Sequence, residues 1–207
     1  MSRFRRRLCL LILLSCGLAP IAFAKGADWD FLGKKDGIYV WKREQAGSEV
    51  PGFRGRAYIG AEPETILTEM LDWKHHTEWM FACAESVLLK KLSDTHAIMY
   101  NRIEAPWPIW DRDVIADTTI ERSTDLITVR FKNIRSSLKK IPRRVVRLPL
   151  LNGYYTLRRV GPKKTKVIYQ VVADIGGSIP RWLAIQSAAA LPYETLNRLR
   201  KRVEGKN

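Results

Sequence analysis

The chain has 207 residues, 46% of them hydrophobic and 10% aromatic, and a formal net charge of +15. This apolar content excludes an intrinsically disordered chain, because such chains lack the apolar surface that offsets the entropy cost of folding. A chain of this length is expected to bury about 70% of the surface that its unfolded form exposes. Residues 25–207 contain no internal repeat or low-complexity linker, so we predict a single domain there.

The N-terminus has the three parts of a secretory signal peptide. Four arginines within residues 3–7 precede the apolar residues 8–14, and Ala22-Phe23-Ala24 supplies a small-residue cleavage site. We therefore predict that residues 1–24 are removed and that the mature protein is periplasmic or secreted. The alternatives are a lipoprotein acylated at Cys16, which ends a lipobox-like run, and an uncleaved anchor, for which the apolar run is short.

Cleavage after Ala24 changes both the charge and the cysteine content. The removed segment holds four arginines and no acidic residue, so the mature chain carries +11 and keeps only Cys83 of the three cysteines. One cysteine excludes an intramolecular disulfide. Cys83 has apolar neighbours and no adjacent basic residue to lower its pKa, so we predict a buried structural thiol rather than a nucleophile.

The elements predicted in chain order are mainly strands, with one helix near each end. Strands are predicted from residue 38 and over residues 53–59, and a helix begins near residues 61–64, where Pro63 and two acidic residues suit a first turn. Further strands are indicated by alternation of apolar and polar residues, or by runs rich in β-branched and aromatic residues, between polar turns. They are predicted at 86–92, 96–105, 113–122, 126–134, 153–160 and 165–174.

Residues 180–203 form the last predicted helix, and its apolar residues recur at steps of three and four, which predicts one face packed on the sheet. These residues are Trp182, Ile185, Ala189, Pro192, Leu196, Leu199 and Val203. The middle of the helix, residues 187–190, has almost no side-chain volume. Either the sheet approaches closely there or another molecule fills the space, and periodicity leaves both open. An α+β architecture follows, with an antiparallel sheet around this helix.

Two segments resemble the StAR-related lipid-transfer (START) family, and weaker matches extend over residues 28–203. Residues 105–115 are similar to the family's "P…RD" strand start, and residues 174–184 to the "D-x-G-G-x-I-P-x-W-L" segment before its C-terminal helix. The residues that carry these motifs are Arg112, Asp113, Asp174, Gly176, Gly177, Pro180 and Trp182. The resemblance implies a helix-grip fold, in which a curved antiparallel sheet wraps around the C-terminal helix and encloses a tunnel for one lipid or other apolar molecule.

The resemblance also implies roles for the motif residues. Gly176 and Gly177 would let the backbone turn sharply out of the last strand. We interpret Arg112 and Asp113 as a structural ion pair or as a clamp at the start of their strand. Some sterol-binding members carry an arginine six residues after the motif arginine, where this chain has Thr118, so a sterol ligand is not supported.

The tunnel that the resemblance implies would be lined by the inner strand faces and the last helix. We predict ligand contacts at Met99, Asn101, Tyr155, Tyr169, Val171, Ile185, Ala188 and Ala189, with Gln170 as a further polar candidate. Residues 135–147 mix basic and apolar side chains, which suits an anionic membrane surface, where each Lys or Arg contributes about 1 kcal/mol. A gate beside the last helix is predicted at Leu138, Lys139, Lys140, Ile141, Arg143 and Arg144; the alternative is a solvated basic face.

The residues predict no metal site, no cofactor and no catalytic group. Adjacent side chains of a helix, such as those of His75 and His76, point about 100° apart and converge poorly on one ion. The predicted function is the binding of a lipid or other apolar ligand by a monomer that binds no nucleic acid, with transfer between membranes as a further step. The alternatives are a cyclase or hydrolase acting in the same cavity and a purely electrostatic binder.

Overall fold

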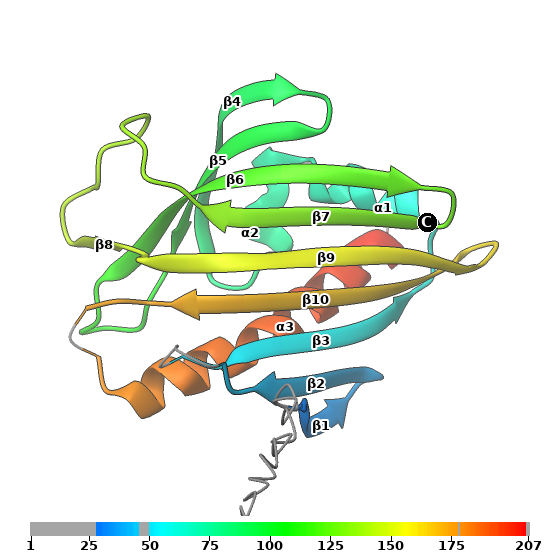
Figure 1. Ribbon diagram of the computed structural model, residues 1–207, viewed down its shortest axis with the longest axis horizontal. Helices are drawn as coiled ribbons and strands as arrows, with labels where there is room; N and C mark the ends of the chain where they lie inside the picture. The colour runs from blue at the N-terminus through cyan, green and yellow to red at the C-terminus, as the bar shows by residue number, and fades with distance from the viewer. Residues whose placement is uncertain (1–27, 46–49, 178, 206–207) are drawn as a thin grey trace, which may run out of the picture.

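The computed structural model describes residues 28–45, 50–177 and 179–205, and in these residues ten strands form one sheet (Figure 1). The strand order is β1-β2-β3-β10-β9-β7-β6-β5-β4, and β8 pairs with β6 beside this path. The strands are β1 (Asp30–Lys35), β2 (Ile38–Arg43), β3 (Gly52–Ile59), β4 (Cys83–Ser93), β5 (His96–Ile103), β6 (Asp111–Ser123), β7 (Leu126–Asn133), β8 (Val145–Arg147), β9 (Leu150–Gly161) and β10 (Lys164–Asp174). Every pairing in them is antiparallel except that of β6 with β8.

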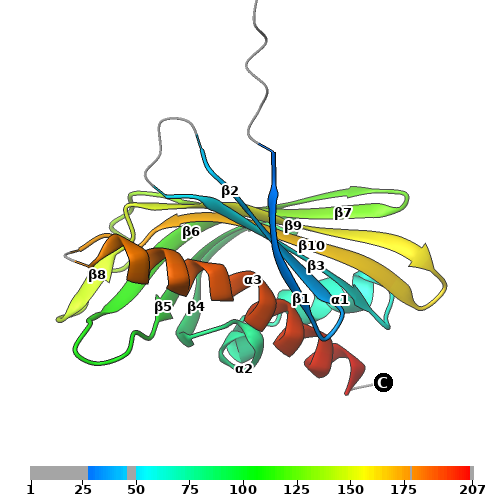
Figure 2. The same ribbon diagram turned by 90° about the horizontal axis from the view of Figure 1, so that it is seen from below.

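The helices lie on one side of this sheet. Figure 2 shows α3 running beneath the sheet, with α1 and α2 on the same side. Their bounds are α1 (Pro63–Met70), the 3-10 helix η1 (Trp73–His75), α2 (His76–Trp79) and α3 (Arg181–Glu204). A bent antiparallel sheet around a long C-terminal helix is the predicted α+β helix-grip architecture, which is therefore confirmed.

The main core lies between α3 and the inner face of β3, β9 and β10. In β10 the buried residues Val167, Tyr169 and Val171 alternate with more exposed ones, because successive side chains of a strand point to opposite faces. Leu196 and Leu199 of α3 are fully buried in the same cluster. Each apolar side chain of this size stabilises the fold by about 1.5–3 kcal/mol when it leaves water.

The predicted apolar face of α3 is confirmed over its second half and wrong at its first turn. Pro192, Leu196, Leu199 and Val203 are buried, and α3 packs there on β3. Trp182 is 67% exposed, because neither the sheet nor another helix covers its side chain in the first turn. The helix is therefore packed on the core from about Ile185 onward, and its first turn projects beyond it.

All the strands predicted from the sequence are present, with ends shifted by a few residues, and the structure adds β1, β8, η1 and α2. Most of β1 is exposed and β8 has three residues, so neither produces a clear alternation of buried and exposed side chains. Among the described residues, no helix is long and apolar enough to cross a membrane. The predicted signal peptide and Cys16 lie outside the described residues.

Candidate functional site

Three facing residue pairs line the inner face of β5 and β6, and we call these six residues the inner strip. They are Ala97 with Thr118, Met99 with Ala116, and Asn101 with Val114. All six are at most 8% exposed. The apolar members nevertheless belong to neither of the two apolar core clusters that the described residues form. The inner strip is thus buried, and it lies apart from the cluster in which α3 packs on β3, β9 and β10.

Two stacked tyrosines lie across from the inner strip on the same side of the sheet. The rings of Tyr155 in β9 and Tyr169 in β10 are nearly parallel, with centroids 4.3 Å apart. The ring centroid of Phe131 is 5.8 Å from that of Tyr155 and 6.2 Å from that of Tyr169. Burial raises the pKa of both hydroxyl groups well above the usual tyrosine value, and Tyr169 further raises that of Tyr155. Both hydroxyls therefore remain neutral hydrogen-bonding groups at any physiological pH.

The eight residues predicted to contact a ligand fall into two groups. Tyr155, Tyr169, Val171, Ile185, Ala188 and Ala189 are in or against the main core cluster, where β9 and β10 meet α3. Met99 and Asn101 are on the inner strip. All eight are buried or partly buried, and their contact with a ligand stays a prediction.

Gln170, the further polar candidate, is on the opposite face of the sheet. Its Oε1 accepts hydrogen bonds from Nε and Nη2 of Arg54, at 3.1 and 2.8 Å, and from the hydroxyl of Tyr154 at 2.9 Å. The prediction that Gln170 could contact an enclosed ligand is therefore wrong. The reason is the strand period of two, which points Gln170 away from its neighbours Tyr169 and Val171.

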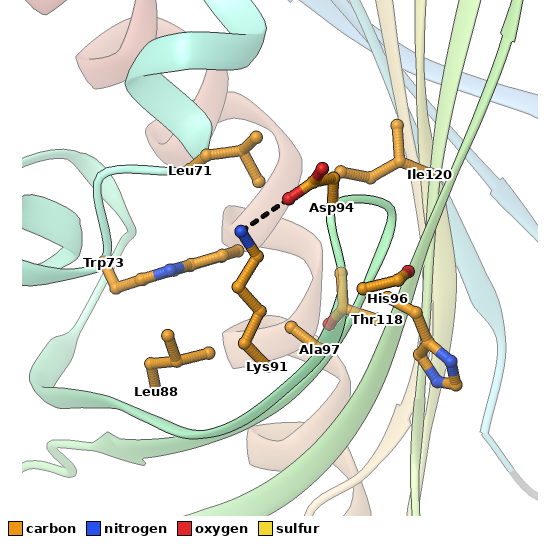
Figure 3. Close-up of a pocket in the computed structure, with 10 residues that line it drawn as sticks. Leu71, Trp73, Leu88, Lys91, Asp94, His96, Ala97, Thr118 and Ile120 are labelled. Atoms are coloured by element: carbon orange, nitrogen blue, oxygen red, sulfur yellow. Dashed lines mark ion pairs between the residues drawn. The ribbon is translucent and has the colours of Figure 1, made fainter.

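A cavity of about 210 Å³ continues the inner strip at the β4–β5 hairpin (Figure 3). Ala97 and Thr118 belong to both the cavity wall and the inner strip. An ion pair between Lys91 Nζ and Asp94 Oδ1, 2.6 Å long, also lines the cavity. Its full lining is Leu71, Trp73, Leu88, Lys91, Ser93, Asp94, His96, Ala97, Thr118 and Ile120. Local sequence patterns do not predict this cavity, because its residues come from three separate stretches of the chain, 71–73, 88–97 and 118–120.

Polar groups next to the inner strip hold the start of β4 against α1 and α2. The imidazole of His76 donates from Nε2 to the carbonyl of Met70 at 2.8 Å, and the hydroxyl of Ser86 donates to Nδ1 at 3.1 Å. Burial lowers the pKa of His76, so the ring stays neutral. Nδ1 of His75 instead contacts Asp72 Oδ2 at 2.6 Å, so the two adjacent histidines hydrogen-bond to different residues.

Cys83 is the buried thiol that the sequence predicted. It is free and 7% exposed, and Asn101 Nδ2 donates to its sulfur at 3.8 Å. Burial raises the pKa of the Cys83 thiol, which keeps it protonated and unreactive. The prediction of a structural rather than nucleophilic cysteine is confirmed.

Arg112 and Asp113 do not pair with each other, so the ion-pair interpretation is wrong. Consecutive side chains in β6 point to opposite faces, and each finds its own partner. Arg112 donates to the carbonyls of Ile175 and Gly176, both at 3.2 Å, and to that of Trp110. The fully buried Asp113 accepts from Arg147 at 2.5 and 2.9 Å. The clamp interpretation applies to Arg112, which ties the start of β6 to the turn before α3.

That turn has the backbone geometry that glycine favours. Gly176 and Gly177 have φ values of +57° and +75°, a region that residues with a Cβ adopt only with strain. Asp174 accepts a hydrogen bond from the backbone N–H of Gly176 at 2.9 Å, and Pro180 is the last residue before α3. The motif residues after β10 thus position the first turn of α3 rather than a ligand.

The predicted gate segment packs partly on the outer face of the sheet, and its end at Val146 lies near Gly176 in the turn before α3, so its role as a gate stays a prediction. The amine of Lys139 is 3.0 Å from Glu85 Oε1 and 4.6 Å from the ring centroid of Tyr100. Ile134 packs on a small outer cluster of Ile98, Tyr100 and Ile115. The pairing of β8 with β6 is what draws this segment across the outer face.

Exposed apolar residues gather at one end of the molecule. Figure 1 shows the β5–β6 connection, the β7–β8 connection and the start of α3 at the same end. The large exposed apolar residues there are Trp107, Trp110, Leu138, Ile141 and Trp182. Lys140, Arg143 and Arg144, which belong to the predicted gate, are also exposed. We call the surface formed by these five apolar residues and three basic residues the exposed apolar end.

Comparison with known proteins gives several matches along most of the chain, although no protein-family model matches it. An uncharacterised protein of Pseudomonas aeruginosa is 34% identical over 198 residues, which are 96% of each chain. The crystal structure of a STAR-related lipid transfer protein from Xanthomonas axonopodis is 33% identical, with a TM-score of 0.77 over 85% of this chain and 98% of that one. Mouse phosphatidylcholine transfer protein is 24% identical over 166 residues, which are 76% of this chain and 75% of its own.

Proposed function

The chain belongs to the StAR-related lipid-transfer (START) family, and from this premise we propose that it binds one lipid between α3 and the inner strip. The observation that carries the proposal is the inner strip itself. Its apolar residues are buried, yet they belong to neither core cluster. Two of the three named relatives are lipid-transfer proteins, which supports a binding role rather than a catalytic one.

The chemistry of the inner strip decides which ligand it suits. An apolar guest that contacted Met99, Val114 and Ala116 would gain dispersion contacts with them. Each square ångström of apolar surface that the guest removes from water contributes about 25 cal/mol. The strip and the tyrosine stack offer amide and hydroxyl groups but no charged side chain. We therefore propose a ligand whose enclosed part is apolar with neutral polar groups.

Lipid exchange with a membrane is proposed to occur at the exposed apolar end. Indole and aliphatic side chains suit the boundary between headgroups and acyl chains, and nearby cations are attracted to anionic lipids. Trp107 is 93% exposed and Trp182 is 67% exposed, which is unusual for residues of this size. The predicted signal peptide supports a periplasmic or secreted location for this exchange, and we propose a monomer as the active form.

Lipid uptake from vesicles tests the binding proposal. The protein is incubated with phosphatidylcholine and phosphatidylglycerol vesicles and then separated from them. Native mass spectrometry measures the mass of the protein with any bound lipid. We expect one lipid per chain. Met99→Trp and Ala116→Phe, which fill the inner strip, should reduce uptake at least about tenfold. Leu92→Trp, at an exposed position of β4, is the matched control.

The melting temperature shows whether each variant is folded. A folded wild-type protein that takes up no lipid would overturn the proposal, and so would full uptake by both folded strip variants. Transfer is tested separately, by following a fluorescent lipid between donor and acceptor vesicles. The double variant Trp107→Ser/Trp182→Ser should slow transfer and leave the amount of bound lipid unchanged. Unchanged transfer by this variant would contradict the membrane-contact proposal.

A further inference from the structure

We propose that the outer face of the sheet, opposite α3, binds a linear polyanion of the acidic polysaccharide class. The surface consists of arginines stacked on aromatic rings along β2, β3, β9 and β10, and we call it the arginine ladder. Its central residues are Trp29, Tyr39, Trp41, Arg43, Arg54, Arg56, Tyr154 and Gln170. It is separate from the inner strip, because it lies on the other face of the sheet.

One row of the ladder crosses five adjacent strands. Strand register places Trp41 of β2 opposite Arg54 of β3, Arg54 opposite Gln170 of β10, Gln170 opposite Tyr154 of β9, and Tyr154 opposite Arg130 of β7. These five strands lie side by side in this order in Figure 1. Facing residues of adjacent strands are about 5 Å apart, so the row is a regular series of polar and cationic groups.

Aromatic rings hold the guanidinium groups in place. The guanidinium carbons of Arg54 and Arg43 are 4.0 and 4.6 Å from the ring centroid of Trp29. That of Arg56 is 4.4 Å from Tyr39 and 5.3 Å from Trp41. The Nε–Nη2 edge of Arg54 is occupied by Gln170 Oε1, so an anion would contact the remaining N–H groups of Arg54 together with the guanidinium groups of Arg43 and Arg56, whose planar shape suits carboxylate, sulfate or phosphate oxygens. The ladder is thus preorganised for anions.

The surrounding charge is almost entirely positive. The outward residues of β3 and β9, and those of residues 164–172 in β10, include no acidic side chain. They do include Arg158, Lys164 and Lys166. Arg130, at the end of the row, is paired with Glu121 at 3.2 Å. Among the described outward residues of these three strands, the positive charge is therefore concentrated around Arg54 and Arg56, while Asp28 and Asp30 flank Trp29 in the chain.

The same contacts indicate which polyanion fits. Single-stranded nucleic acid needs free aromatic faces on which its bases stack, but here guanidinium groups lie over the rings of Trp29 and Tyr39. A membrane would favour the exposed apolar end, where the exposed tryptophans are found. A chain of acidic sugars instead presents one anion after another along a flexible backbone. Such a chain can contact several separate cations on this face, among them Arg54, Arg56, Arg158 and Lys166.

Binding of dextran sulfate, measured by isothermal titration calorimetry against neutral dextran of the same length, tests the proposal. We expect binding of dextran sulfate alone. Arg54→Gln/Arg56→Gln should weaken it at least about tenfold, since two charge-assisted contacts are lost. Lys90→Gln/Lys201→Gln removes the same charge from exposed positions elsewhere and should change the affinity less than about twofold. Arg54→Lys/Arg56→Lys keeps the charge without the planar fork, and should also bind more weakly than the wild type.

Several results would overturn the proposal. Equal weakening by the two glutamine double variants would show attraction by net charge alone. Unchanged affinity of the lysine double variant would show that guanidinium orientation does not matter. Tighter binding of an oligothymidylate than of dextran sulfate would assign the surface to nucleic acid. Unchanged melting temperatures and lipid uptake of the variants keep this test independent of the proposed lipid site.

Discussion

Gly55 of β3 lies directly against Pro192 of α3, so closely that a Cβ atom on Gly55 would be 2.8 Å from Cβ of Pro192. The same atom would be 2.7 Å from Cδ1 of Leu196. This contact sets the distance between the helix and the sheet. The sheet therefore does approach the helix closely. The close approach is at Gly55 and Pro192, just beyond the small residues 187–190.

Gly55→Val should destabilise the protein by about 1–3 kcal/mol, because the added carbons have to displace Pro192 or Leu196. Urea unfolding followed by tryptophan fluorescence measures the change in the free energy of unfolding. Gly161→Ala is the matched control, since its new carbon would be 3.4 Å from Cβ of Lys164, an ordinary contact. Equal stability of Gly55→Val and the wild type would show that α3 is not seated on β3 in this way.

Arg147→Met should destabilise the fold by about 3–5 kcal/mol, because it leaves the carboxylate of Asp113 buried without its charge partner. Asp113 is fully buried, and Arg147 is its ion-pair partner at 2.5 Å. The double variant Asp113→Asn/Arg147→Met should recover part of the loss, as no buried charge remains. Denaturant unfolding of the three proteins makes the comparison. A double variant less stable than Arg147→Met would contradict this account.

Arg112→Lys should loosen the turn before α3 without unfolding the protein. A lysine amine cannot reproduce the fork through which Arg112 donates to the carbonyls of Ile175 and Gly176. Amide hydrogen exchange in residues 175–183 should accelerate by about tenfold or more, the effect of losing one charge-assisted hydrogen bond. Arg102→Lys, in the partly buried pair with Asp111, should leave exchange there unchanged. Unaltered exchange in both variants would show that Arg112 does not hold the turn.

His76 should make stability depend on pH below about 6.5, the usual histidine pKa. Burial lowers the pKa of His76 in the folded protein, so at mildly acidic pH the unfolded chain binds a proton that the folded chain does not. The contribution of the neutral ring is complete above that pH and falls as the pH drops toward the folded-state pKa. The slope is at most about 1.4 kcal/mol per pH unit.

Urea midpoints between about pH 5 and pH 7.5 measure this slope. His76→Gln should flatten it, since an amide can still donate to the carbonyl of Met70 but does not titrate. His96→Gln is the control, because His96 is more exposed and contacts Asp117. Identical slopes for the wild type and His76→Gln would exclude His76 as the source.

Local patterns were enough to predict most strands and the last helix. Alternation such as Val167, Tyr169 and Val171 is a property of one strand, and the three-and-four spacing of Leu196, Leu199 and Val203 is a property of one helix. The inward direction of Tyr155 and Tyr169 follows from the same alternation. The exposed edge strand β1 and the short β8 were not predicted, because their pairing with neighbouring strands defines them and their own residue pattern does not.

The partners of polar residues depended on strand order and could not be obtained from local pattern. Arg147 is 34 residues from Asp113, and Arg54 is 116 residues from Gln170. The sequence alone determined which side chains face inward along each element, because that is decided by backbone period. Only the tertiary structure decided which inward faces pack against α3 and which, like the inner strip, lie outside that cluster, because packing depends on how closely elements distant in sequence approach one another.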